Sequence, residues 1–185
     1  MNKILLLALV LLTSGELFSQ ETISDSYTIQ RLIILNENGE VLLEKHKNGW
    51  MTPALRHNNK VTTNDGLKNL ASSFGLNIST PKLAGIFMFV SEYKPQSSFR
   101  QHYVCKTIDG KLILPEEKLD VQWFAPHKAI EMMSLPDAKL IGAVGDMTEQ
   151  ILQYPEIIWG GTFTLWKEEG VTQYKVTENF YPIAN

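Results

Sequence analysis

Residues 62–76, TTNDGLKNLASSFGL, are the stretch that says most about the fold of this chain. Their apolar side chains recur at i, i+3, i+4 and i+7, the spacing of one helix face: Leu67, Leu70, Ala71 and Phe74. Thr62 or Thr63 can cap the start of such a helix, with Asp65 favourable in its first turn. Gly75 is the residue expected just past its end. The stretch therefore predicts a short amphipathic helix that packs against a sheet.

Runs rich in β-branched and aromatic residues predict strands on both sides of this helix. These strands are expected at residues 27–35, 41–44, 83–93, 100–108, 121–124, 162–166 and 172–177. Asn-Gly at residues 38–39 predicts a tight hairpin between the first two, whereas residues 49–59 show no period and predict a loop. Two further helices are expected, at residues 126–133 and 137–154. The second has six apolar residues predicted to face inward: Leu140, Ile141, Val144, Met147, Ile151 and Leu152.

The order of these elements predicts one α/β domain around a mixed sheet, with an extra C-terminal β-hairpin at about residues 158–181. That hairpin is rich in Trp, Phe and Tyr. We expect it to cover the core. The alternative is a ligand or partner surface, because aromatic residues are frequent at binding hot spots.

The first 20 residues are typical of a secretory signal peptide. A positively charged start containing Lys3 precedes the apolar run at residues 4–12, and residues 13–20 are small and polar. The apolar run is shorter than the roughly 20 residues of a membrane span, although an uncleaved anchor is the alternative. We expect cleavage between residues 15 and 21, export to the periplasm or the medium, and no stable membrane anchor afterwards. The mature domain then covers residues 21–185.

The composition excludes some partners. The net charge is −3, and the leader removes one Lys and one Glu, so electrostatic binding to nucleic acid is not expected. The only cysteine is Cys105, which excludes an intramolecular disulfide. It lies in a strand-like run and is predicted to be a buried structural thiol.

Several motifs in this order resemble the Nudix hydrolases over residues 31–152. Residues 50–53, Trp-Met-Thr-Pro, are similar to the Trp-x-x-Pro before the family's signature. Residues 67–76 resemble the signature helix and its closing Gly-Leu, and residues 121–126, VQWFAP, resemble the strand and turn into the next helix. The resemblance implies an α/β/α sandwich around a mixed sheet.

The signature itself, Gly-x5-Glu-x7-Arg-Glu-U-x-Glu-Glu-x-Gly-U with U a bulky aliphatic residue, is degenerate here. With Gly75 as the anchor, its chemical positions are occupied by Ala54, Lys60, Lys68, Asn69, Ser72 and Ser73. With Pro53 as the anchor instead, Val61 takes the position of the first Glu. In the family these glutamates hold divalent cations against a diphosphate. A hard cation needs anionic oxygen ligands, so the resemblance implies a fold without the usual catalytic residues.

Other candidate residues are weaker. Trp50, Arg56 and His57, in the predicted loop, are candidate ligand contacts. Glu116, Glu117 and Asp120 are candidates for metal or water contact, since some Nudix enzymes carry a supplementary carboxylate there; the alternative is a solvated acidic turn. The histidines show no metal-binding spacing and are expected at the surface or hydrogen-bonded: His46, His57, His102 and His127.

Two functions follow. The first is an exported binding or accessory module for a small molecule or a protein, with no cofactor and little Mg²⁺- or Mn²⁺-dependent hydrolysis. The second is a hydrolase of nucleoside-diphosphate-linked compounds that uses Mg²⁺ or Mn²⁺ on carboxylates outside the signature. The geometry of the carboxylates beside the helix at residues 62–74 distinguishes them.

Overall fold

The computed structural model describes residues 28–57, 61–134 and 139–184, except for the side chains of residues 139–141. Some predictions therefore lie outside the described part: those for the leader, for Lys60, for Asp137 and for the side chains of Leu140 and Ile141. The described elements are β1 (Thr28–Leu35), β2 (Val41–His46), β3 (Gly49–Met51), β4 (Ala54–Arg56), α2 (Thr63–Ser73), β5 (Leu76–Ile78), β6 (Lys82–Ser91), β7 (Ser98–Gly110), β8 (Asp120–Phe124), α3 (Pro126–Met133), α4 (Lys139–Gln153), β9 (Ile158–Glu168) and β10 (Val171–Ala184). None of the helices in this part of the chain is long and apolar enough to span a membrane.

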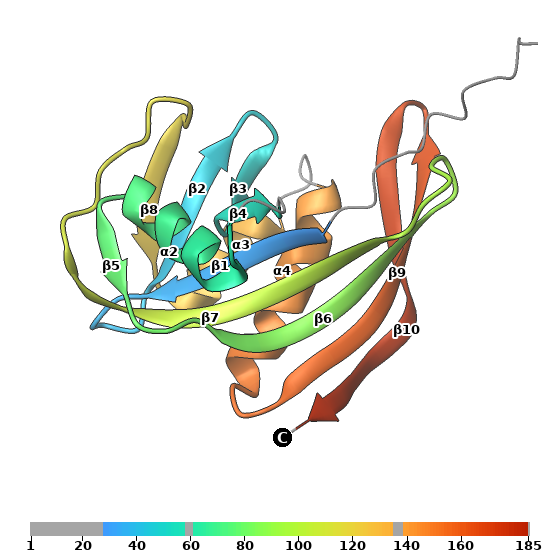
Figure 1. Ribbon diagram of the computed structural model, residues 1–185. Helices are drawn as coiled ribbons and strands as arrows, with labels where there is room; N and C mark the ends of the chain where they lie inside the picture. Colours follow the sequence, from blue (N-terminus) through green and yellow to red (C-terminus); the bar gives the residue numbers. More distant parts are fainter. Residues whose placement is uncertain (1–27, 58–60, 135–138, 185) are drawn as a thin grey trace, which may run out of the picture.

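The strands form one mixed sheet with helices on both faces (Figure 1). Its main path runs β10-β9-β6-β7-β1-β2-β3, while β4 pairs with β1, β5 with β7 and β8 with β2. The pairs β1–β7 and β6–β9 are parallel, and the other pairs are antiparallel. The predicted hairpin at residues 36–39 is confirmed: Gly39 has a φ of 75°, and the Asn36 side chain accepts hydrogen bonds from the backbone of Asn38 and Glu40. Because the sheet contains both parallel and antiparallel pairs, the prediction of a mixed sheet is also confirmed.

The helix α2 forms where its sequence pattern predicts. The Thr62 side chain accepts a hydrogen bond from the Asp65 backbone N–H, and Gly75 follows the helix with a φ of 75°. The apolar face packs on β1, β2, β5, β7 and β8 in one cluster of buried residues: Leu32, Ile34, Leu42, Leu67, Ala71, Phe74, Leu76, Ile78, Cys105 and Val121. Leu70 is only partly buried at the edge of this cluster. Tertiary packing thus gives this short helix the support that it needs.

The opposite face of the sheet carries α3, α4 and the larger core. Met133 of α3 and Val144, Met147 and Ile151 of α4 pack against residues of β1, β2, β6 and β9. Phe87 and Phe163 are completely buried there, with ring centroids 6.5 Å apart. The two helical layers and the sheet between them make the predicted α/β/α sandwich.

The C-terminal hairpin is part of the sheet. β9 pairs in parallel with β6 (Figure 1), and Trp159, Phe163 and Leu165 of β9 are buried in the larger core. The Tyr174 hydroxyl of β10 donates a hydrogen bond to Asp146 of α4 at 3.1 Å. The expected role in covering the core is confirmed. Both strands are longer than predicted, because Gly160 and Gly161, which weaken a strand signal, here make room for aromatic rings of β10.

The prediction of a loop at residues 49–59 was wrong in part, because this stretch contains the strands β3 and β4. Trp50 of β3 pairs with Lys45 of β2, and Leu55 of β4 pairs with Gln30 of β1. These strands of three residues are set by their tertiary partners, and a propensity pattern does not detect them. The same reason explains β5, which was not predicted and pairs with β7.

Candidate functional site

The outward face of α2 carries the residues that correspond to the degenerate signature. Lys68, Asn69, Ser72 and Ser73 are all exposed, and the Ser73 hydroxyl donates to the Leu70 carbonyl at 2.7 Å. Ala54 lies in β4, behind the start of the helix. These four residues therefore bring a cationic amine, an amide and two hydroxyls to this face, and the exposed Asp65 in the first turn adds one carboxylate, which accepts a hydrogen bond from the Thr62 hydroxyl.

Two of the three candidate acids lie in the exposed turn before β8, and the third, Asp120, is the partly exposed first residue of β8. Glu116 and Glu117 are exposed, and the Asp120 carboxylate accepts hydrogen bonds from the Val121 backbone and the Gln122 side chain. Within residues 28–57, 61–134 and 139–184, no group of three or more His, Cys, Asp or Glu side chains is arranged to hold a metal ion. The donor set in these ranges therefore does not fit a divalent cation site of the kind that the resemblance implies.

The three loop candidates differ in their exposure. Trp50 is only 7% exposed and packs edge-to-face on Phe124 at 5.1 Å, so it is a core residue with little surface for a ligand. Arg56 is exposed at the end of β4, and the His57 backbone N–H donates to the Thr28 carbonyl. None of these three residues, and none of the three candidate acids, lines either of the two cavities described below.

One carboxylate that no sequence pattern indicated is buried within the sheet itself. Glu44 of β2 is 2% exposed, and its oxygens lie 2.8 Å from His46 Nε2 and 2.9 Å from Lys118 Nζ. The hydrogen-bonded state expected for His46 is therefore confirmed. Lys118 connects the loop before β8 to β2, so this cluster positions that loop. In the sequence, the spacing of Glu44 and His46, two residues apart on one strand, indicates that their side chains lie on the same side of the sheet.

A second buried polar group surrounds Arg31 and His102. Arg31 donates to the Thr52 carbonyl, and burial together with the Arg100 charge lowers its pKa to about 10. His102 is completely buried, which corrects the expected surface or hydrogen-bonded state: neither ring nitrogen makes a hydrogen bond within the described residues. The physical reason is that β7 lies between β1 and β6 in the sheet, and the larger core covers its His102 side. Burial, and then the Arg31 charge, hold the His102 pKa well below its usual value.

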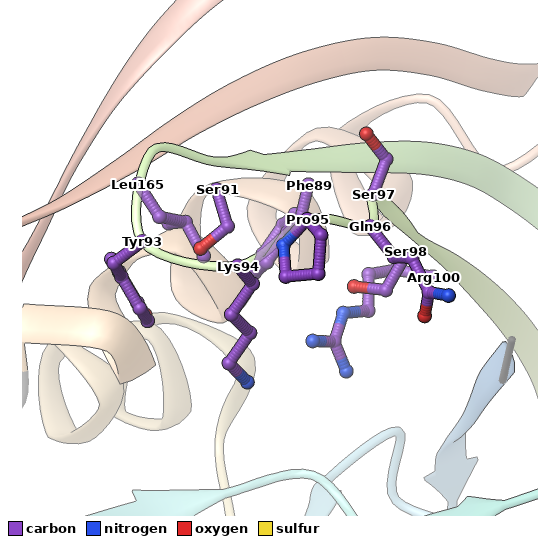
Figure 2. Close-up of a pocket in the computed structure, with 10 residues that line it drawn as sticks. All are labelled: Phe89, Ser91, Tyr93, Lys94, Pro95, Gln96, Ser97, Ser98, Arg100 and Leu165. Carbon is purple, nitrogen blue, oxygen red and sulfur yellow. The ribbon is translucent and has the colours of Figure 1, made fainter. Parts of the chain in front are cut away.

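The basic cavity lies under the loop between β6 and β7 (Figure 2). Its volume is about 130 Å³, and it is lined by Phe89, Ser91, Tyr93, Lys94, Pro95, Gln96, Ser97, Ser98, Arg100 and Leu165. The charged ends of Lys94 and Arg100 point to the same side of the cavity (Figure 2). Among the described residues, no carboxylate lines it.

Aromatic rings hold the cations of this region in place. The Arg100 guanidinium lies over the Phe89 ring at 4.7 Å from its centroid, and Lys94 and Lys167 lie 5.9 Å and 5.2 Å from the centroid of Tyr93. Burial alone would raise the Tyr93 pKa, but hydrogen bonds and the two lysine charges lower it overall. This site could not be predicted from the sequence, because its cations come from both sides of a hairpin loop and their spacing matches no motif. The arrangement can bind an anion.

Comparison with known proteins places this geometry in a known fold. The sequence matches no protein-family model and no curated protein. Its structure is similar to the mutator MutT protein of Bacillus halodurans, with a TM-score of 0.60, 17% identity, and coverage of 82% of this chain and 97% of that one. It is also similar to a Nudix hydrolase of Nitrosomonas europaea (TM-score 0.57, 15% identity, 77% and 80% coverage) and to an ADP-ribose pyrophosphatase of Streptococcus suis (0.52, 13%, 77% and 100%). On these similarities and the topology above, the chain has the fold of the Nudix hydrolases.

Proposed function

We propose that this protein is an exported binding protein with a Nudix fold that holds a small anionic ligand without hydrolysing it. The observation that supports the proposal is the basic cavity, which Lys94 and Arg100 line and which has no carboxylate among its described lining residues. Convergent charges in a partly enclosed site attract and orient an anion more strongly than the same charges on an open surface.

The absence of hydrolysis is inferred from the chemistry of α2. A metal-assisted diphosphatase needs anionic oxygens to hold its cations, and these cations stabilise the transition state and activate water. Lys68, Asn69, Ser72 and Ser73 bring no negative charge to the exposed face of the helix, and the one acid in its first turn, Asp65, accepts a hydrogen bond from the Thr62 hydroxyl at the helix cap. Removing a single well-placed electrostatic group costs about 10² to 10³ in rate, and several such groups differ here.

The ligand is expected to place one anionic group in the cavity. A volume of about 130 Å³ is below the roughly 300 Å³ at which ligand pockets usually begin, so it suits a phosphate or carboxylate group with the rest of the molecule outside. Structurally similar proteins include a UDP-X diphosphatase and an ADP-ribose pyrophosphatase. Nucleoside-diphosphate-linked compounds are therefore the first class to test.

Calorimetric titration with ADP-ribose, inorganic pyrophosphate and uncharged adenosine tests the binding. We expect both anions to bind and adenosine to bind much more weakly. Lys94→Gln should weaken binding of the anions by about two- to fivefold, the effect of one partly exposed ion pair. Lys111→Gln is the matched control, because Lys111 is exposed after β7 and lines neither cavity. Equal binding of adenosine, or equal effects of the two substitutions, would contradict this site.

A hydrolysis assay with the same compounds and either Mg²⁺ or Mn²⁺ tests the inactivity. We expect no release of phosphate or nucleotide above the rate without protein. A turnover near about 1 s⁻¹, within the ordinary enzyme range, that is lost when Glu116, Glu117 and Asp120 are all replaced would establish the alternative, an enzyme with a relocated metal site.

A further inference from the structure

A second cavity lies at the other end of β7, remote from the basic cavity. Its volume is about 330 Å³, within the range of small-molecule pockets. Its wall comes from the turn after β1, the start of β5, the end of β7 and from β8: Asn36, Glu37, Leu76, Thr107, Ile108, Asp109, Gly110, Leu112 and Trp123. We call it the acidic cavity, because Glu37 and Asp109 are the charged residues among its described lining residues.

Two polar side chains of this cavity, those of Asp109 and Asn36, are held by hydrogen bonds. Asp109 accepts a hydrogen bond from the Asn77 side chain, and Asn36 is held by Glu40 and by the turn backbone. Among the salt bridges of the described residues, none involves Glu37 or Asp109. The two carboxylates therefore give the cavity a formal charge of −2.

The indole of Trp123 and the aliphatic side chains of Leu76 and Leu112 complete the wall of the acidic cavity. Trp123 of β8 and Leu112 are partly buried against the cluster beneath α2, and Leu76 is almost completely buried. The end of β7 is also rigid. A side chain at Gly110 would come within 2.2 Å of the Gly75 carbonyl oxygen, and the Ile113 backbone N–H donates to the Phe74 carbonyl. The indole thus lines a preformed hollow next to two carboxylates.

We propose that the acidic cavity binds a small organic cation, an ammonium group on a short apolar body. The face of an indole attracts a cation, the carboxylates supply the opposite charge, and Leu76 and Leu112 contact the apolar body. An anion is disfavoured by the same carboxylates. A divalent metal ion would need more oxygen ligands than these two carboxylates provide, and no metal-holding group occurs within the described ranges.

The probe is choline, compared with its neutral isostere in which a tert-butyl group replaces the trimethylammonium. Titration calorimetry on the mature protein should detect choline binding that weakens with salt, and at least about tenfold weaker binding of the isostere, a difference of about 1.4 kcal/mol. Glu37→Gln and Asp109→Asn should each weaken choline binding by about two- to fivefold. Trp123→Leu should weaken it by about two- to thirtyfold.

Glu116→Gln is the matched control, because it removes the same charge from an exposed residue that does not line the cavity. Unchanged thermal unfolding of the Gln and Asn variants separates a binding effect from a folding defect. Equal binding of choline and its isostere would overturn the proposal, as would equal effects of Glu116→Gln and Asp109→Asn. Binding of glucose but not choline would show a neutral-sugar site instead, and no choline binding at millimolar concentration would reject the site.

Discussion

The stability of this protein should fall in mild acid because of one residue, His102. Its side chain is completely buried, its ring lies edge-on to Phe87 at 5.2 Å, and neither ring nitrogen makes a hydrogen bond within the described residues. Burial, and then the charge of Arg31, hold its pKa well below the usual value, while the backbone of Arg100 acts in the opposite direction. The folded protein therefore keeps His102 neutral, whereas the unfolded chain takes up a proton near pH 6.5.

The sign and size of the effect follow from proton linkage. A group whose folded pKa is depressed contributes stability above its unfolded pKa, and this stability is lost as the pH falls below that value. Each pH unit below about 6.5 then costs about 1.4 kcal/mol until the folded pKa is reached. Between about pH 7.5 and about pH 5 the loss that His102 causes is at most about 2 kcal/mol.

Urea unfolding of the wild type and His102→Leu at these two pH values is the measurement. The carboxylates and the other histidines titrate in both proteins, so their contributions cancel in the difference between the two free energies of unfolding. We expect that difference to shift by up to about 2 kcal/mol in favour of the variant on acidification. At the higher pH the variant should lose little stability, because it removes a buried polar ring without partners. A difference that does not change with pH would refute the reasoning.

Three further predictions concern stability, the thiol and processing. Gly75→Ala should destabilise the fold by more than about 1 kcal/mol in urea unfolding, because a Cβ there would lie 2.3 Å from the Lys111 carbonyl oxygen; Gly39→Ala, with the same φ of 75° and nothing within 4 Å, is its matched control and should cost less. Burial raises the Cys105 pKa to about 12, so a thiol reagent should label Cys105 only after denaturation, and rapid labelling of the folded protein would contradict this. The mature N-terminus should lie between residues 16 and 21; N-terminal sequencing of protein from the native host that begins at Met1 or Asn2 would disprove cleavage.

The sequence predicts the elements whose signals are local. The helix α2 has a cap, an apolar face and a terminal glycine within fifteen residues, and each of these features acts where it is expected, at Thr62, at Leu67 and at Gly75. The Asn-Gly turn is local in the same sense. Such features depend on hydrogen bonds and dihedral angles between near neighbours, so a single sequence is enough to predict them.

Features that depend on distant partners were not predicted. β3, β4 and β5 exist because β2, β1 and β7 supply hydrogen-bonding edges. His102 reads as an ordinary polar residue on a strand until its neighbours in the sheet are known. The two cavities could not be predicted for the same reason. Lys94 and Arg100 line one cavity from the two sides of a loop, and Glu37 and Asp109 line the other from the turn after β1 and from β7. A motif search compares fixed spacings, and these cavities have none.

The central strand β7 separates the two cavities physically. Arg100 lies near its start and Asp109 near its end, so nine residues of extended chain place them about 30 Å apart at roughly 3.3 Å per residue. That distance is about four Debye lengths at physiological ionic strength, so the cations of the basic cavity do not cancel the carboxylates of the acidic one. Each end of the strand therefore keeps its own charge preference, and neither site uses the exposed face of α2. Both proposed binding sites thus lie at the ends of one central strand, and the lining of neither includes the α2 residues at which the resemblance to the Nudix hydrolases would locate catalysis.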